Sequence, residues 1–102
     1  MSQAQQNPSD ETLIKMGCFE NEWITFQKLH GKLAQIYVGF RKVNGDERIY
    51  ITEKFPVVKV SKTGKETIAF YGRQIFPTDR STAQMCSTKI ENLDYMIFST
   101  TS

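Results

Sequence analysis

The sequence predicts an α+β fold that is mostly β: an antiparallel meander that curls into a small sheet or partly open barrel of five or six strands, with one short helix in the C-terminal half. Three observations lead to this fold class. Segments with alternating apolar and polar residues are separated by glycine turns, at His30-Gly31, Asn44-Gly45 and Thr63-Gly64. Proline interrupts the pattern at Phe55-Pro56, and proline donates no hydrogen bond to a sheet. One later segment has the spacing of a helix.

The first three segments are expected to form an antiparallel meander of strands at about 22–28, 33–43 and 46–54. A two-residue turn at Asn44-Gly45 pairs Phe40 with Ile49 and Val38 with Ile51, whereas a three-residue loop pairs Phe40 with Arg48. We prefer the first register because it keeps apolar residues opposite one another. A loop around Gly31, in the left-handed conformation, extends the apolar face by pairing Phe26 with Ala34 and Ile24 with Ile36.

The second half of the chain continues with a corner, a hairpin, a helix and a last strand. Phe55-Pro56 is expected at a corner, and the turn at Lys62-Thr63-Gly64 pairs Val58 with Ile68. Ser81-Thr82-Ala83-Gln84 has the pattern of a capping box, and it precedes a helical stripe of Ala83, Cys86, Ile90 and Leu93. Residues 94–98 indicate a buried strand.

A length of 102 residues fits one domain, with a flexible tail at 1–10 and a single β-rich domain at 11–102. A short helix is expected at Thr12–Met16, after the capping residues Ser9 and Asp10. The net charge is +2, but residues 28–89 hold twelve Lys or Arg against five Asp or Glu. This excess favours an anionic partner; the alternative is a set of strands kept soluble by lysine.

Signals for a membrane, a metal, a cofactor or catalysis are weak or missing in the sequence. No long apolar run or secretory leader occurs, so we expect a cytoplasmic protein. Cys18 and Cys86 are expected as free thiols, although a disulfide between them is the alternative. His30 is the one histidine, and the sequence indicates no nucleophile or carboxylate positioned beside it, so we expect no enzyme. Its spacing from Cys18 and Cys86 is not that of zinc ligands, so we expect no zinc site.

The most informative pattern is the polar face of the predicted meander, where alternation gathers aromatic residues and arginines. In the preferred register Trp23 pairs with Tyr37, and Arg41 lies opposite Arg48. Rings that stack bases and cations that pair phosphates are typical of single-stranded nucleic-acid binding. The candidate binding residues, which include three from the second hairpin, are Trp23, Tyr37, Arg41, Arg48, Tyr50, Lys59, Tyr71 and Arg73.

Two functions remain open from the sequence. The first is a non-catalytic protein that contacts single-stranded DNA or RNA through this face. The second is a protein-interaction module, for example an inhibitor or accessory subunit of the kind viruses encode, which uses the same face or an open strand edge. Tyr, Trp and Arg also dominate protein interfaces, so the face does not separate the two. The same aromatic residues can instead be packed inside the domain.

Overall fold

The computed structural model describes residues 20–101. The elements in chain order are α2 (Glu20–His30), the 3-10 turn η1 (Gly31–Leu33), β1 (Ala34–Arg41), β2 (Glu47–Thr52), β3 (Val57–Val60), β4 (Glu66–Phe76), β5 (Gln84–Lys89), the 3-10 turn η2 (Ile90–Asn92) and β6 (Leu93–Thr100). The predicted tail at 1–10, the helix expected at 12–16 and Cys18 lie outside the described residues.

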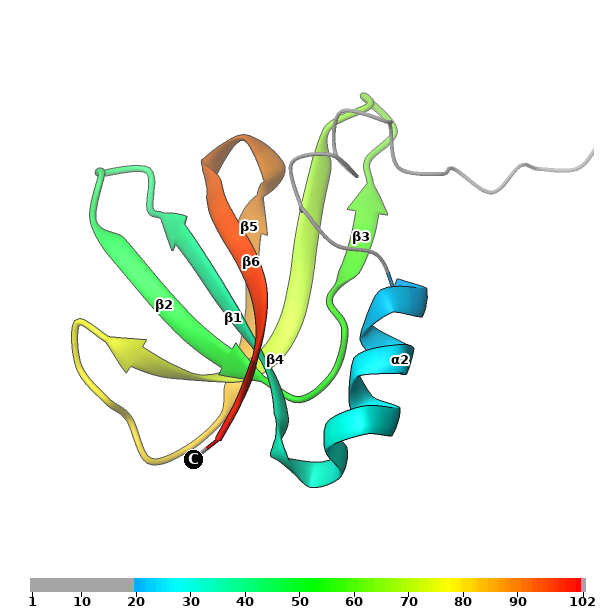
Figure 1. The fold of residues 1–102 in the computed structure, drawn as a ribbon. Helices are drawn as coiled ribbons and strands as arrows, with labels where there is room; N and C mark the ends of the chain where they lie inside the picture. Colours follow the sequence, from blue (N-terminus) through cyan, green and yellow to red (C-terminus); the bar gives the residue numbers. More distant parts are fainter. Residues whose placement is uncertain (1–19, 102) are drawn as a thin grey trace, which may run out of the picture.

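The six strands form one antiparallel sheet that curls into a half-barrel, as Figure 1 shows. The strand order is β3-β4-β2-β1-β6, and β5 pairs with β4. The long strand β4 joins the two halves, because its first residues pair with β3 and its last residues with β2. The predicted fold class, a mostly β curled sheet with one helix, is confirmed for the described part of the chain.

The helix, however, lies at the other end of the domain from its predicted position. Residues 22–28, predicted as a strand, belong to α2. Acidic residues in the first turn of α2 and basic residues in its last turn interact favourably with the helix dipole. Gly31, with φ of +58°, ends the helix. Gly31 is thus left-handed as predicted, but it follows a helix rather than turning a hairpin. Consequently β1 pairs with β2 and β6.

The helix predicted from Ser81 to Leu93 is wrong, because that region contains β5, η2 and the start of β6. β5 adds to the free edge of β4, with Cys86 opposite Phe70 and Thr88 opposite Ile68. The period is therefore two: Cys86 and Thr88 face inward, while Ser87 is exposed. A segment rich in Ser and Thr is a poor helix former, and the open backbone of β4 gives it a better partner.

The first hairpin also has a different register from the preferred one. The backbone N–H of Gly45 donates to the carbonyl of Lys42 at 2.8 Å, and that of Lys42 donates to the carbonyl of Asp46 at 2.8 Å. Gly45 has φ of +93°, which suits the last position of a three-residue loop. Phe40 therefore lies opposite Arg48, and Arg41 lies opposite Glu47. The predicted pair of facing arginines does not exist.

Of the remaining predicted features of the sheet, the second hairpin and the corner agree with the structure, whereas the last strand agrees only in part. Val58 pairs with Ile68 across the second hairpin, and the chain turns between β2 and β3 at Phe55-Pro56. The last strand is longer than predicted and is buried on one side only, with Met96 inside and Ile97 exposed.

The inner face of the half-barrel holds the hydrophobic core, and α2 covers one end of it. Trp23 is 3% exposed and contacts Phe26 and Phe98, with ring centroids 6.1 and 5.2 Å away. Behind these rings lie the fully buried side chains of Ile36 and Val38. The end of the interior away from α2 is not filled in this way, and it holds the candidate site.

Candidate functional site

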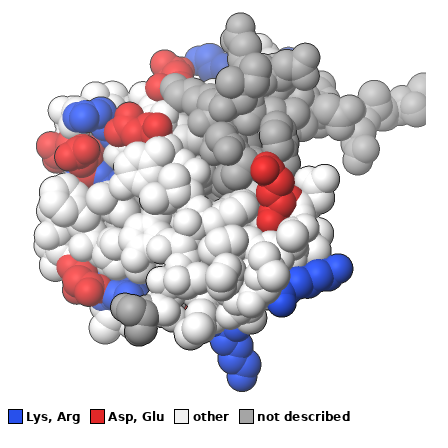
Figure 2. All heavy atoms as spheres, in the orientation of Figure 1, with Lys and Arg blue, Asp and Glu red and all other residues white. Residues whose placement is uncertain are grey.

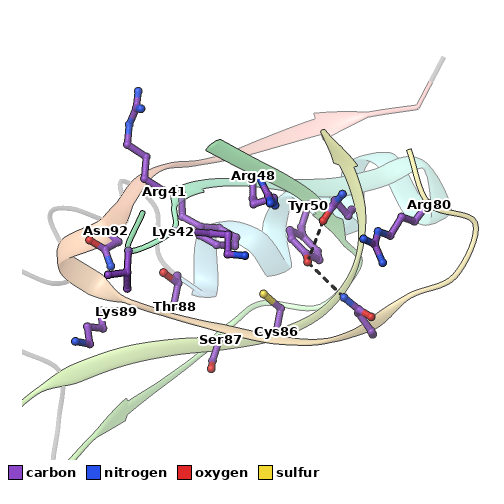
Figure 3. Close-up of a pocket in the computed structure, with 14 residues that line it drawn as sticks. Arg41, Lys42, Arg48, Tyr50, Arg80, Cys86, Ser87, Thr88, Lys89 and Asn92 are labelled. Atoms are coloured by element: carbon purple, nitrogen blue, oxygen red, sulfur yellow. Dashed lines mark hydrogen bonds between the residues drawn. The ribbon is translucent and has the colours of Figure 1, made fainter. Parts of the chain in front are cut away.

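A cavity of about 460 Å³ opens at the end of the half-barrel interior opposite α2. Its walls come from the β1–β2 hairpin, β2, the end of β4, the loop after it, β5 and η2 (Figure 3). The lining residues are Phe40, Arg41, Lys42, Val43, Arg48, Tyr50, Gln74, Arg80, Gln84, Cys86, Ser87, Thr88, Lys89 and Asn92. Five of them are cations, and no Asp or Glu is among them.

Three of the five cations, Lys42, Arg48 and Arg80, lie around Tyr50 in the cavity. In Figure 3 the side chains of Lys42 and Arg80 extend toward Tyr50 from opposite sides, and Arg48 lies beside it on β2. Within residues 20–101, Lys42 and Arg80 make no ion pair. Arg48 is held by the carbonyl of Glu47 at 2.9 Å, and its second terminal nitrogen lies 3.9 Å from the Asp46 carboxylate. Positive charge therefore gathers here with little compensation.

Arg41 behaves differently from these three cations. It lies at the rim and points away from the cavity in Figure 3. Its guanidinium is 3.7 Å from the carboxylate of Glu47 and 3.4 Å from that of Asp94. The side chain is about half exposed, so these pairs contribute little to stability.

The floor of the cavity is aromatic with polar groups on its surface. Phe40 and Tyr50, both 5% exposed, stack with ring centroids 5.8 Å apart. The Tyr50 hydroxyl donates to the Gln74 side-chain oxygen at 3.4 Å and accepts from the Gln84 amide at 3.5 Å. Both hydrogen bonds are at the long limit. A closer acceptor entering the cavity can therefore compete for the hydroxyl.

Burial raises the pKa of the Tyr50 phenol and of the Cys86 thiol beside it. For Tyr50, a hydrogen bond with Gln84 and the charge of Arg80 act in the opposite direction but are smaller. For Cys86, hydrogen bonds with Tyr50 and Ser87 oppose the burial effect. Both groups are thus kept protonated at neutral pH. Tyr50 presents a neutral donor, and Cys86 is not an activated nucleophile.

Of the candidate residues from the sequence, the cavity brings together Arg41, Arg48 and Tyr50. They do not lie on one exposed sheet face as expected, because the register of the first hairpin differs by one residue. Arg48 and Tyr50 face inward with the core, and Arg41 lies at the rim. The aromatic ring and the arginines are therefore close, but in a hollow.

The remaining five candidates lie elsewhere. Trp23 is in the core beneath α2, which supports the packing alternative for this residue. The outer face of the sheet carries the other four, which are Tyr37, Lys59, Tyr71 and Arg73. Tyr37 and Arg73 both neighbour Ile51 in the register, and Tyr71 is 55% exposed. Arg73 is paired with the carboxylate of Asp79 and donates to the carbonyl of Arg80 at 3.1 Å.

The cavity residues that sequence reasoning missed include Lys42, Arg80 and Lys89. Lys42 reaches the cavity from the hairpin loop, and Arg80 reaches it from the irregular segment between β4 and β5. The position of Lys42 follows from the β1–β2 hairpin, and that of Arg80 follows from the chain segment between the paired strands β4 and β5. The signal in the sequence was the alternation of Cys86 and Thr88, which is typical of a strand. It could have placed Lys89 next to them.

On the one face that Figure 2 shows, the described Lys and Arg residues do not gather into a cluster. Figure 2, in the orientation of Figure 1, shows Lys, Arg, Asp and Glu of the described part around the margin of the view, with an uncharged centre. Within residues 20–101 there is no group of His, Cys, Asp and Glu that could hold a metal ion. No helix in the same range is long and apolar enough to cross a membrane.

Comparisons with protein-family models, with curated proteins and with solved structures found no match to this chain.

Proposed function

We propose that this domain is a small non-catalytic protein that binds single-stranded nucleic acid, and that the cavity at the open end of the half-barrel is its binding site. One observation carries the proposal. Lys42, Arg48 and Arg80 come from a hairpin loop, a strand and a second loop, and they all border a cavity that no Asp or Glu lines. Like charges held together repel one another, and a bound phosphate offsets that repulsion.

The size of the cavity favours a single strand over a duplex. At about 460 Å³ it lies in the lower part of the range of roughly 300–1,000 Å³ that small ligands occupy. An unpaired nucleotide can turn out of the strand into such a hollow, whereas paired and stacked bases inside a duplex cannot. The phosphates of neighbouring nucleotides then lie over the mouth near Lys89, while Arg41 at the rim is already paired with Glu47 and Asp94 and contributes less.

Phosphate contacts position a nucleic acid but carry no information about its sequence. Because cations dominate the cavity, we expect affinity to depend strongly on salt and weakly on base sequence. DNA and RNA have the same phosphate groups, so we expect single strands of both to bind.

The experiment is a titration with short homopolymer strands of about ten nucleotides, measured by fluorescence anisotropy. If three phosphates are neutralised, affinity should fall about 20-fold between roughly 50 and 200 mM salt. The variant Lys42→Ala with Arg80→Ala should bind more weakly, and its affinity should fall only about threefold over the same range. The matched control is Lys62→Ala with Lys65→Ala, which removes the same charge at the exposed β3–β4 turn. It should behave like the unsubstituted protein.

Two results would contradict the proposal. One is the absence of binding by any strand at low salt. The other is an equal loss of affinity in the control variant, since that would mean that net charge alone, and not the cavity, attracts the strand.

The second candidate function is a protein-interaction module that uses the outer face of the sheet. The observation that favours it is the exposure of Tyr71 and Ile97, at 55% and 52%, on a face that also carries Tyr37. Among the described strands, β6 also pairs on one edge alone, with β1. A domain that binds no strand but loses a protein partner on Tyr71→Ser and Ile97→Ser would have this function instead.

A further inference from the structure

The cavity is closed at its inner end, which limits how a strand can enter it. Its floor is formed by the rings of Phe40 and Tyr50. Beyond them, Val38, Ile36 and Trp23 fill the half-barrel as far as α2. A strand cannot pass through the interior, so an inserted group must enter and leave by the same mouth. The end of a strand meets this condition with less bending of its backbone than an internal nucleotide does.

The positive charge that borders the cavity also suits a strand end. An internal phosphodiester carries one negative charge, whereas a terminal phosphate monoester carries about 1.5 to 2 at neutral pH and has three terminal oxygens. Within residues 20–101 Lys42 and Arg80 have no acidic partner, and Arg48 has only a carboxylate 3.9 Å away. Three cations with so little compensation match a dianion better than a monoanion.

A neutral hydrogen-bond donor lies beside these cations. The Tyr50 hydroxyl has only long hydrogen bonds, to Gln74 at 3.4 Å and from Gln84 at 3.5 Å. Because burial raises the pKa of the phenol, it remains a donor throughout the neutral range. In Figure 3 it lies between the side chains of Lys42 and Arg80. A phosphate oxygen placed there receives the phenol hydrogen and both charges.

On the basis of the nucleic-acid function proposed above, we infer that the cavity captures the phosphorylated end of a single strand. The terminal phosphate monoester is bound by Lys42, Arg48, Arg80 and the Tyr50 hydroxyl. The terminal nucleotide fills the rest of the cavity. The strand then leaves past Arg41 and Lys89 at the mouth.

The test compares four strands of one sequence on the full chain by isothermal titration calorimetry. They are 5′-phosphorylated, 3′-phosphorylated, hydroxyl-ended at both ends, and circular. One phosphorylated strand should bind about tenfold or more tightly than the hydroxyl-ended strand, since it adds at least one charge-assisted hydrogen bond. The circular strand should bind no better than the hydroxyl-ended one. Tyr50→Phe should reduce the advantage of the phosphate, while the control variant Lys62→Ala with Lys65→Ala should retain it.

The outcomes separate this inference from the function on which it rests. Equal binding of phosphorylated, hydroxyl-ended and circular strands overturns end capture and leaves nucleic-acid binding intact. No binding by any of the four overturns both. A nucleoside monophosphate that binds as tightly as the phosphorylated strand also overturns end capture, because the ligand is then the free nucleotide. Retention of the full phosphate advantage by the Lys42→Ala and Arg80→Ala variant places the end elsewhere and overturns it too.

Discussion

The two ends of the half-barrel interior are built from different kinds of residue and differ in how closely they are packed. At the α2 end, Trp23 and Phe98 fill the interior with closely packed rings. At the open end, cations and amides surround a hollow whose floor is Tyr50. Close packing of apolar groups stabilises the folded chain, whereas like charges around an unfilled cavity do not. The contrast indicates that the α2 end contributes more to the stability of the fold, and the open end is the part to which we assign the proposed binding site.

The largest expected effect is the loss of the aromatic core beneath α2. Trp23→Ala should lower the free energy of unfolding by about 3–5 kcal/mol, because it removes a buried ring and leaves a cavity. Urea unfolding measures this loss. The control Leu29→Ala, on an exposed side of the same helix, should stay within about 0.5 kcal/mol of the unsubstituted protein. In conditions where the Trp23→Ala protein is folded, its affinity for strands should be unchanged. A stable variant that no longer binds would mean that Trp23 contacts the ligand.

An intermediate effect is expected from pH, because the open end buries a phenol and a thiol. Burial raises the folded-state pKa of Cys86 above its ordinary 9.0 and that of Tyr50 above its ordinary 10.0. As pH rises past these values, the unfolded chain releases protons that the folded chain retains. Stability that is fully present below about pH 9 therefore decreases above it. Burial likewise raises the pKa of Tyr95 on the outer face, with the charges of Glu47 and Asp94 adding to it.

Thermal unfolding between neutral and alkaline pH measures this dependence. The double variant Tyr50→Phe and Cys86→Ala should lose less stability than the unsubstituted protein as pH rises. Tyr71→Phe, at an exposed position, is the control and should follow the unsubstituted protein. An identical pH dependence in the double variant would show that the floor of the cavity is open to water.

The smallest effect is expected at the rim. Arg41→Ala removes a cation that points away from the cavity and is already paired with Glu47 and Asp94. Stability should change by no more than about 1 kcal/mol, as for other exposed ion pairs. Affinity should fall less than it does in Lys42→Ala. An equal or larger loss would place the strand over the rim rather than inside the cavity.

The sequence was informative where one local signal was sufficient. The β3–β4 hairpin was predicted with its register, because Gly64 at the last position of a three-residue loop fixes which residues face each other, Val58 and Ile68 among them. The first hairpin was different. β2 carries Ile49 and Ile51 on one face and Tyr50 on the other, so hydrophobicity did not select the register.

The errors in the helix assignments have a related cause. The aromatic residues of α2 suggested a strand, although Trp23, Phe26 and His30 lie at helical spacings and their rings contact one another in series. The stripe from Ala83 to Leu93 suggested a helix, but the unpaired edge of β4 is a tertiary feature that no local pattern reveals. The candidate site depended on both. Arg48 and Tyr50 were selected for an exposed face, whereas the β1–β2 register places them inside beside Lys42, and Arg80 reaches them from the segment between β4 and β5.

The most direct test of the central claim is to map strand contacts residue by residue. The measurement is the change in backbone amide NMR shifts when a short single strand, hydroxyl-ended or phosphorylated, is added to isotope-labelled protein at low salt. The largest changes should lie in residues 40–43, 48–50 and 80–92, which surround the cavity. Residues 20–30 of α2 and the outer-face residues Tyr37, Tyr71 and Arg73 should change little. Largest changes on α2 or on the outer face, or no changes at all, would contradict the account.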